Sequence, residues 1–229
     1  MIAILLAARS GSKRLPNKHF LKITSSLRII DLCILRLKKA KLVNKIFLCT
    51  TKKKNDDKFE KVCELHNINI YRGSENDVQK RLIDCAKKNS IKIIVRITAD
   101  CPIIDPKLID KCIKLHLKKK CDYTSNTLTL SFPDGLDVEI INLKSLLKSQ
   151  RISKTNSNKE HVTTFIRESK LFKKFNYKNS INYSDRRWTL DYQKDLVFLK
   201  KVTRHFLPNI HFSWNDLIKA EKLKSLVNI

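Results

Sequence analysis

The chain has 229 residues, 48 of them Lys or Arg and 22 Asp or Glu, so its formal charge is 48 − 22 = +26. Its 42% of hydrophobic residues and its length exclude a disordered chain. No apolar run approaches the roughly 20 residues that a membrane helix needs. The apolar start, Met1–Ala8, is too short for a secretory signal. We therefore expect a cytoplasmic protein with no membrane partner.

The positive charge alone does not indicate a nucleic-acid-binding protein. There are 36 Lys but only 12 Arg, and 26 Ile against 9 Val, a bias expected from a genome rich in A and T. The lysines are also spread along the whole chain. We expect no specific nucleic acid partner, although such a surface attracts polyanions such as a nucleoside triphosphate.

The seven cysteines include no C-x-x-C pair, and no histidine stands at metal-ligand spacing. Several of them fall among Ile and Leu in helical patterns. This usage predicts buried, reduced thiols rather than disulfides or a metal site.

Over the first two-thirds of the chain, short apolar runs alternate with amphipathic stretches, a pattern typical of βαβ units around a mostly parallel sheet. The apolar runs predict strands at 2–7, 45–50, 68–71 and 93–98. Helical spacing of apolar residues predicts helices at 29–40, 59–66, 78–86 and 107–117. The polar segment Ser74–Asp77 and Asp105 before Pro106 are the expected caps of the last two.

The pattern changes after Cys121. Two strands are expected at 122–126 and 136–141, joined through a Pro133-Asp134-Gly135 turn. The remaining predictions are helices at 143–151 and 159–168, strands at 172–177 and 187–190, and helices at 195–205 and 214–226. With no repeat and no long linker, residues 1–229 are predicted to form a single α/β domain. A β arm for dimerisation or substrate binding is expected near 121–178.

The loop after the first strand, residues 8–18, carries four basic residues, two serines and Gly11, one of only three glycines. Ligands of α/β sheets bind outside the carboxyl ends of the strands, where this loop lies. Gly11 permits close backbone approach to an anion. The side chains suited to a phosphate chain are Arg9, Ser10, Ser12, Arg14 and Lys18. The loop matches neither a Walker A nor a G-x-G-x-x-G sequence, and a solvated basic turn is the simple alternative.

This loop, A-R-S-G-S-K-R-L-P-N-K, resembles the opening of the sugar cytidylyltransferases, which include the CMP-sialic acid and CMP-Kdo synthetases and the SpsF branch of spore coat polysaccharide biosynthesis. The resemblance continues over nearly the whole chain. It returns in Y-R-G-S at 71–74, R-I-T-A-D-C-P at 96–102, D-Y-T-S-N at 122–126, F-P-D-G-L-D-V-E at 132–139, E-H-V-T at 160–163 and R-W-T-L-D at 187–191.

The resemblance implies a three-layer Rossmann-like nucleotidyltransferase fold with a mostly parallel sheet. It implies transfer of CMP from CTP to a nonulosonic-type sugar acid with release of pyrophosphate, for surface polysaccharide or glycoconjugate biosynthesis, by a homodimer. Mg²⁺ would be held by Asp100 and Asp191, and the catalytic residues would be Arg14, Lys18 and Asp100. The implied nucleotide contacts are Ala8, Arg9, Gly11, Ser12, Arg14, Lys18, Arg72, Ser74 and Arg81.

The acceptor side is expected around an acidic strand. On a strand from Leu136, Asp137 and Glu139 share one face, where they would bind sugar hydroxyls or an amino group, or simply pair with surface lysines. His161 suits a general base, although Mg²⁺ alone could acidify the nucleophile, so that role stays open. The predicted substrate contacts are Tyr123, Asn126, Asp134, Asp137, Glu139 and His161.

Other functions stay open at this point. A glycosyltransferase of similar topology usually carries an Asp-x-Asp pair, and only Asp100 stands here. A UTP- or GTP-dependent sugar nucleotidyltransferase would share the fold. A nucleic-acid-binding module explains the charge but not the acidic cluster. The chain departs from the family pattern at Gln193-Lys194, where Pro-Glu is usual, and at Asn17, where Gly is usual, although Asn tolerates a positive φ.

Overall fold

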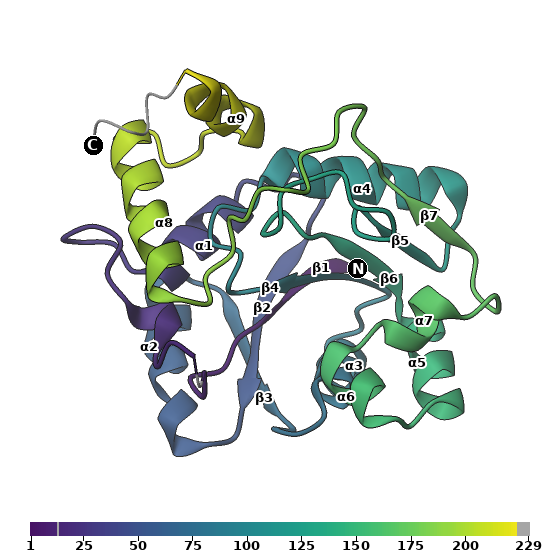
Figure 1. Ribbon diagram of the computed structural model, residues 1–229. Helices are drawn as coiled ribbons and strands as arrows, with labels where there is room; N and C mark the ends of the chain where they lie inside the picture. Colours follow the sequence, from purple (N-terminus) through teal and green to yellow (C-terminus); the bar gives the residue numbers. More distant parts are fainter. Residues whose placement is uncertain (13, 224–229) are drawn as a thin grey trace.

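The computed structural model describes residues 1–12 and 14–223 (Figure 1). Within these residues, seven strands form one sheet in the order β3-β2-β1-β4-β6-β5-β7. Their bounds are β1 Ile2–Ala7, β2 Lys45–Thr51, β3 Asn69–Gly73, β4 Ile93–Thr98, β5 Tyr123–Ser125, β6 Glu139–Asn142 and β7 Lys174–Asn176. β6 is antiparallel to β4 and β5, and all other neighbours are parallel. The predicted α/β fold with a mostly parallel sheet is confirmed.

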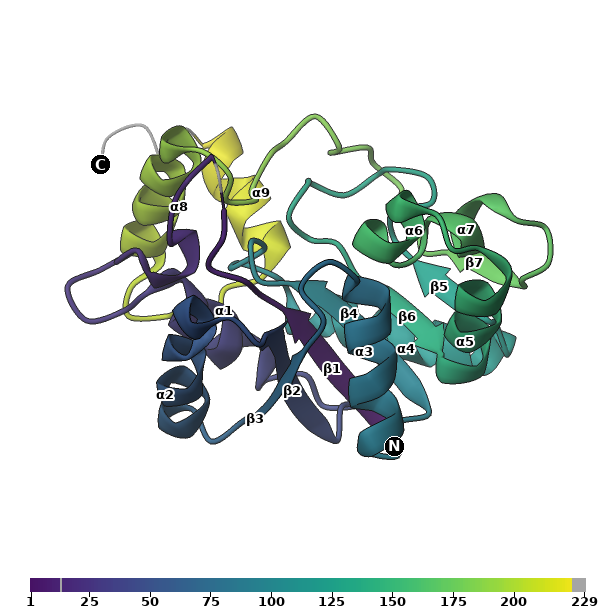
Figure 2. The same cartoon turned by 90° about the horizontal axis from the view of Figure 1, so that it is seen from below.

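Helices cover both faces of the sheet, which makes three layers (Figure 2). One face packs against α1 (Ile29–Leu37), α2 (Lys58–Leu65), α4 (Pro106–Lys119), α8 (Gln193–Phe206) and α9 (Trp214–Lys222). The other packs against α3 (Val78–Lys88), α5 (Leu143–Ile152) and α7 (Thr164–Glu168), with α6 (Asn156–His161) beside α3. Because both faces are covered, central strands such as β1 are apolar along their length.

The predicted helix starts are confirmed by their caps. The Asp77 side chain accepts a hydrogen bond from Lys80 N at 2.7 Å where α3 begins. The Asp105 side chain accepts one from Lys107 N at 2.8 Å where α4 begins, with Pro106 in the first turn.

The order of the strands positions the site. The chain runs from β1 to β2 and β3 on one side, then crosses to β4 on the other side of β1. The carboxyl ends of β1 and β4 are therefore a topological switch point, where open α/β sheets bind their ligands. The loop 8–17 follows β1 and Asp100 follows β4, so both meet at this point.

Three predicted elements differ in the structure. The strand expected at 136–141 begins only at Glu139, because the Asn126 amide binds Leu136 O and Val138 N, each at 2.9 Å, and takes them out of the ladder. The segment 187–190 is not a strand and makes a single bridge, Arg187 to Asp134. The helix expected at 159–168 is broken at Val162 into α6 and α7.

The strands expected in the β arm, between 121 and 178, continue the main sheet beyond β4. Of the last predicted helix, α9 covers 214–222, and residues 224–226 lie outside the described residues. All seven cysteines are buried and free, as predicted. Among the described residues, no helix has both the length and the apolar character needed to cross a bilayer.

Candidate active site

The first half of the loop after β1 is held by a carboxylate that the sequence analysis missed. Asp56, in the 3-10 helix η2 (Lys54–Asp56), accepts hydrogen bonds from Ser10 N at 2.8 Å and Ser10 Oγ at 2.5 Å, and from the Thr51 hydroxyl. Burial favours the neutral acid, but these hydrogen bonds outweigh it and lower the pKa of Asp56. Its contacts join segments 46 residues apart, so no local motif reveals it.

The second half of the loop turns at Asn17 into the 3-10 helix η1 (Lys18–Phe20). Asn17 has φ 55° and ψ 25°, in the left-handed region, which explains why a residue tolerant of positive φ stands here. Its side-chain oxygen accepts a hydrogen bond from the Lys58 ammonium. The loop therefore keeps a defined turn that delivers Lys18 inward.

Lys18 is the centre of the site. It is only 7% exposed, and its Nζ lies 3.1 Å from Asp100 Oδ2, 3.0 Å from Asp191 Oδ1 and 2.8 Å from Leu190 O. The backbone supports the same arrangement, because Leu190 N donates to Asp100 O at 2.8 Å. The two aspartates that the resemblance paired as metal ligands are thus neighbours, although the sequence separates them by 91 positions.

Two arginines complete the surroundings of Asp191. Arg14 Nη2 lies 2.8 Å from Asp191 Oδ1, and Arg187 Nη2 lies 2.7 Å from Asp191 Oδ2. Arg187 also binds Asp134 Oδ2 at 2.7 Å. Arg187 was not among the predicted site residues, although it belongs to the R-W-T-L-D block that ends in Asp191. The Arg187 guanidinium thus connects Asp134, in the turn of the predicted acceptor side, with Asp191, which the basic loop contacts.

Both aspartates are suited to a divalent cation. Burial favours their neutral forms, but Lys18 outweighs it and lowers the pKa of Asp100, and Lys18 with Arg187 does the same for the pKa of Asp191. The described residues contain no cluster of three or more His, Cys, Asp or Glu side chains that could cage a metal alone. Mg²⁺ typically uses only one or two carboxylates and takes its other ligands from water and phosphate, so this pair fits it.

His19 follows Lys18 in η1, lies near Asp100 and was also missed. It is 4% exposed, and burial lowers its pKa to about 4, so the ring is neutral at physiological pH. Among the described residues its Nδ1 has no hydrogen-bond partner. A neutral ring at this place adds no charge beside Asp100.

The predicted nucleotide contacts divide into two groups. Ala8 is buried at the end of β1, where its N–H binds Cys49 O, and Gly11 and Arg14 are exposed on the loop. Ser12 Oγ accepts from Leu15 N at 3.4 Å. Arg9 is half-exposed and reaches to within 3.9 Å of Glu160 on α6. These residues all belong to the loop that leads from β1 to Lys18.

The second group lies around β3 and α3. Arg72 is a structural anchor here: its guanidinium binds Glu60, Asp57 and two backbone carbonyls. Ser74 caps the turn before α3 by accepting from Asp77 N at 3.1 Å. Arg81 is 2% exposed, and its Nη1 donates to Ser74 O at 2.9 Å.

The structure differs from two predictions on the acceptor side. Tyr123 and Glu139 were expected to contact substrate, but each is at least 96% buried and hydrogen-bonded inside the protein. Asn126 is buried too, although it lines the small cavity beside Asp137. The Asn126 amide donates a hydrogen bond to Leu136 O and accepts one from Val138 N. Glu139 forms an ion pair with Arg96 and accepts hydrogen bonds from Tyr123 Oη and from the Thr163 hydroxyl. The alternative of a surface strand paired with lysines is also wrong for Glu139, because its cation is Arg96 of β4.

Asp137 keeps the position expected of a substrate contact. No cation of the described residues lies within ion-pair distance of it, and it lines a small cavity of about 100 Å³ with Asn126 and Asp134. Burial and the nearby Asp134, Glu139 and Asp100 raise the pKa of Asp137 to about 6. A carboxyl of this kind can accept a hydrogen bond or a proton from a bound hydroxyl.

A cavity of about 510 Å³ opens next to this acidic region. It is lined by Arg96, Leu128, His161, Thr163, Thr164, Arg167 and Glu168. Arg167 donates to Thr127 Oγ1 at 3.2 Å and to Thr127 O at 2.9 Å, and no carboxylate of the described chain pairs with it. Arg96 Nε is buried and, among the described residues, has no partner. Of this lining, only His161 was predicted, although a charged residue inside an apolar strand such as Arg96 in β4 was a usable signal. We call this space the acceptor cavity.

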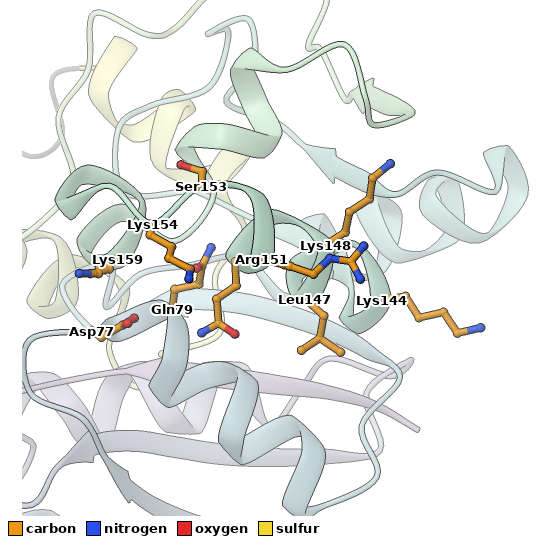
Figure 3. Close-up of a pocket in the computed structure, with 10 residues that line it drawn as sticks. Asp77, Gln79, Lys144, Leu147, Lys148, Arg151, Ser153, Lys154 and Lys159 are labelled. Atoms are coloured by element: carbon orange, nitrogen blue, oxygen red, sulfur yellow. The ribbon is translucent and has the colours of Figure 1, made fainter.

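A third opening, a groove of about 670 Å³, lies between α3 and α5 and contains none of the predicted site residues (Figure 3). It is lined by Asp77, Gln79, Lys144, Leu147, Lys148, Gln150, Arg151, Ser153, Lys154 and Lys159. Its five cations have no ion-pair partner among the described residues, which is consistent with the solvated lysine surface that the composition predicts.

A substitution at Gly11 separates loop function from folding. A Cβ at Gly11 would meet no described atom within 4 Å, and the residue does not have a positive φ. Gly11→Ala should therefore leave the melting temperature unchanged. If the loop binds CTP as the resemblance implies, the same variant should raise the KM for CTP several-fold, because the methyl group would occupy space that the nucleotide approaches.

Gly135→Ala is the matched control for this substitution. Gly135 has φ +107°, and a Cβ added there would lie 2.7 Å from Thr189 N. This variant should therefore lose about 1–3 kcal/mol of stability. Thermal melting and CTP kinetics on both variants check the prediction. Loss of stability in Gly11→Ala, or unchanged CTP kinetics, would contradict it.

Two cations of the loop after β1, Arg14 and Lys18, contact carboxylates at the switch point of a mostly parallel sheet, and this arrangement suits a nucleotidyltransferase. Comparison with known proteins agrees and is more specific. The family model described as "Cytidylyltransferase" matches residues 3–226, and the chain belongs to this family.

Three similar proteins illustrate the relation. A cytidylyltransferase structure from Leptospira borgpetersenii superposes with a TM-score of 0.94 at 35% identity, covering 99% of this chain and 96% of that one. The spore coat polysaccharide biosynthesis protein SpsF of Bacillus subtilis is 32% identical over 72% of this chain and 70% of its own length. A CMP:2-keto-3-deoxy-manno-octonic acid synthetase solved with CTP shares the fold, with a TM-score of 0.67 at 12% identity over 90% of this chain and 99% of that one.

Proposed function

We propose that this enzyme transfers CMP from CTP to the hydroxyl of a nonulosonic-type sugar acid and releases pyrophosphate, in the synthesis of a surface polysaccharide or glycoconjugate. The observation that carries the proposal is Lys18 Nζ lying within 3.1 Å of both Asp100 and Asp191 at the end of the basic loop. This geometry gathers cations for the triphosphate and carboxylates for a metal at one point. In-line transfer at a phosphate needs little else but positioning and charge stabilisation.

Mg²⁺ is the proposed cofactor, held by Asp100 and Asp191. When bound, it would neutralise charge on the phosphate oxygens as the bond to pyrophosphate breaks. Arg9, Arg14 and Lys18 bind the β- and γ-phosphates in this proposal, with Arg14 exposed and able to swing from Asp191 toward the nucleotide.

Arg81 supports binding of the nucleoside end. It is almost fully buried, its Nη1 donates to Ser74 O at 2.9 Å, and its Nε has no partner among the described residues. Burial lowers its pKa. A buried guanidinium that forms no ion pair is costly unless a ligand accepts its hydrogen bonds, and the carbonyl of cytosine is such an acceptor.

The acceptor cavity supports an acidic sugar rather than a neutral one. Its lining places Arg96, Arg167 and His161 against one carboxylate, Glu168. Because Arg96 is already paired with Glu139, Arg167 is the cation left to bind a substrate carboxylate. Its planar guanidinium suits a bidentate carboxylate contact.

The proposed function is tested by pyrophosphate release with each NTP against a panel of nonulosonic and Kdo-type acids, with hexose phosphates as neutral-ring controls. We expect turnover with CTP and at least one sugar acid. Arg167→Ala should raise the KM for that acid more than about tenfold and leave the KM for CTP unchanged. The control is Arg151→Ala, which removes an exposed arginine from the groove between α3 and α5 and should change neither KM. Turnover with UTP or GTP and a sugar phosphate would overturn the proposal, as would sugar transfer without pyrophosphate.

A homodimer belongs to the same proposal. Segment 121–178 carries exposed apolar side chains, among them Leu130 at 59% and Leu171 at 56%. These side chains are accessible to a second copy, and light scattering on the purified chain measures the oligomeric state: a dimer supports this part of the proposal and a monomer overturns it.

A further inference from the structure

A buried hydrogen-bond network joins the sheet to the acceptor cavity through Glu139. The carboxylate is 4% exposed and binds Arg96 of β4, Tyr123 of β5 and Thr163, the last two at 2.5 Å through the same oxygen, Oε1. Burial favours the neutral acid, yet these partners outweigh it and lower the pKa of Glu139. Two of the three partners, Arg96 and Thr163, line the acceptor cavity.

Thr163 is attached to the most strained backbone in this region. Val162 has φ 68° and ψ −50°, and Thr163 N donates to His161 O at 2.7 Å across it, which makes a γ-turn of the rare positive-φ kind. A β-branched residue seldom adopts this conformation, so the surrounding structure must enforce it.

The contacts that enforce the turn come from both sides. The Val162 side chain is fully buried in the cluster that includes Leu82 and Ile166, and Val162 O accepts a hydrogen bond from Gln79 Nε2 at 2.8 Å. On the other side, the Thr163 hydroxyl is tied to Glu139. The turn ends α6 at His161 and starts α7 at Thr164, and both residues line the acceptor cavity.

We propose that Glu139 is a positioning residue that holds the strained turn at Val162 through the Thr163 hydroxyl, and thereby sets how tightly the acceptor cavity binds its substrate. The inference rests on the proposed function for the identity of that substrate. Glu139 does not touch the nucleotide site in this scheme. Loss of the tether should therefore weaken acceptor binding and leave CTP binding intact.

The test removes the tether without removing volume. Thr163→Val should raise the KM for the sugar acid at least about tenfold, because a buried hydrogen bond to a charged acceptor is lost, with the KM for CTP unchanged. Hydrogen exchange should accelerate at the amides of 161–166, because the strained turn can now relax. Thr163→Ser keeps the hydroxyl and should behave like the wild type in both measurements.

Tyr123→Phe is the matched control, since it removes a hydrogen bond to the same Glu139 oxygen without touching the turn. It should leave exchange at 161–166 unchanged. Wild-type exchange and wild-type acceptor KM in Thr163→Val would overturn the inference while leaving the proposed function standing. If the wild-type enzyme shows no CTP turnover with any acid, the proposed function fails, and exchange in the three variants still decides whether Glu139 holds the turn.

Discussion

Asp100→Asn is expected to lower kcat more than about tenfold while the protein keeps its fold, and Asp191→Asn is expected to do the same. Each amide retains the size of the carboxylate but loses the charge that would hold Mg²⁺. Each also loses half of the negative charge around Lys18 Nζ, which lies 3.1 Å from one carboxylate and 3.0 Å from the other. Steady-state pyrophosphate release over a range of Mg²⁺ concentrations measures the effect.

A control variant and a melting measurement distinguish loss of the metal ligand from loss of the fold. Asp185, whose side chain is 74% exposed and pairs with Arg186, provides the control Asp185→Asn, which should have wild-type kinetics. Melting temperatures within a few degrees of the wild type show that the fold survives. Wild-type turnover in Asp100→Asn would remove the metal assignment, and with it the central part of the proposed function.

Lys18→Ala should raise the KM for CTP and lower kcat, each about tenfold, because it removes the buried cation that the proposed function places against the phosphate chain. Lys114→Ala, on the surface of α4, removes the same charge far from the site and should have no effect. If both CTP parameters of Lys18→Ala equal those of the wild type, Lys18 does not bind phosphate.

Lys18→Ala should also change how the stability of the protein depends on pH. In the wild type the pKa values of Asp100 and Asp191 are lowered, so their ion pairs with Lys18 stabilise the protein above the ordinary carboxyl pKa of about 4 and this stabilisation disappears as pH falls through the lowered values. Without Lys18, burial at Asp100 loses its main opposing charge, so the pKa of Asp100 rises, while Asp191 keeps its ion pairs with Arg14 and Arg187. The variant should therefore be less stable than the wild type at pH 7, and the difference should shrink below about pH 4. Thermal melts at both pH values check this, and a difference that grows on acidification would contradict it.

The local parts of the fold followed from local patterns. The first four strands of the chain, the caps Asp77 and Asp105 and the turn at Gly135 were all predicted, because each depends on neighbouring residues alone. The errors arose where distant groups compete with local preference. The Asn126 amide displaced the start of β6, and the tether and packing at Val162 broke a helix that the apolar spacing had predicted as continuous.

In the candidate site, too, some features follow from local sequence and others depend on contacts between distant residues. The amino-acid sequence by itself determined the family, the basic loop and the pair of aspartates, since these are short motifs whose chemistry is carried by residue type and spacing. Only the tertiary structure decided that Lys18 meets carboxylates 82 and 173 positions away, and that Glu139 is buried against Arg96 rather than exposed to a sugar. Such contacts depend on strand order and on which charges burial brings together, and these are settled only when the whole sheet has formed.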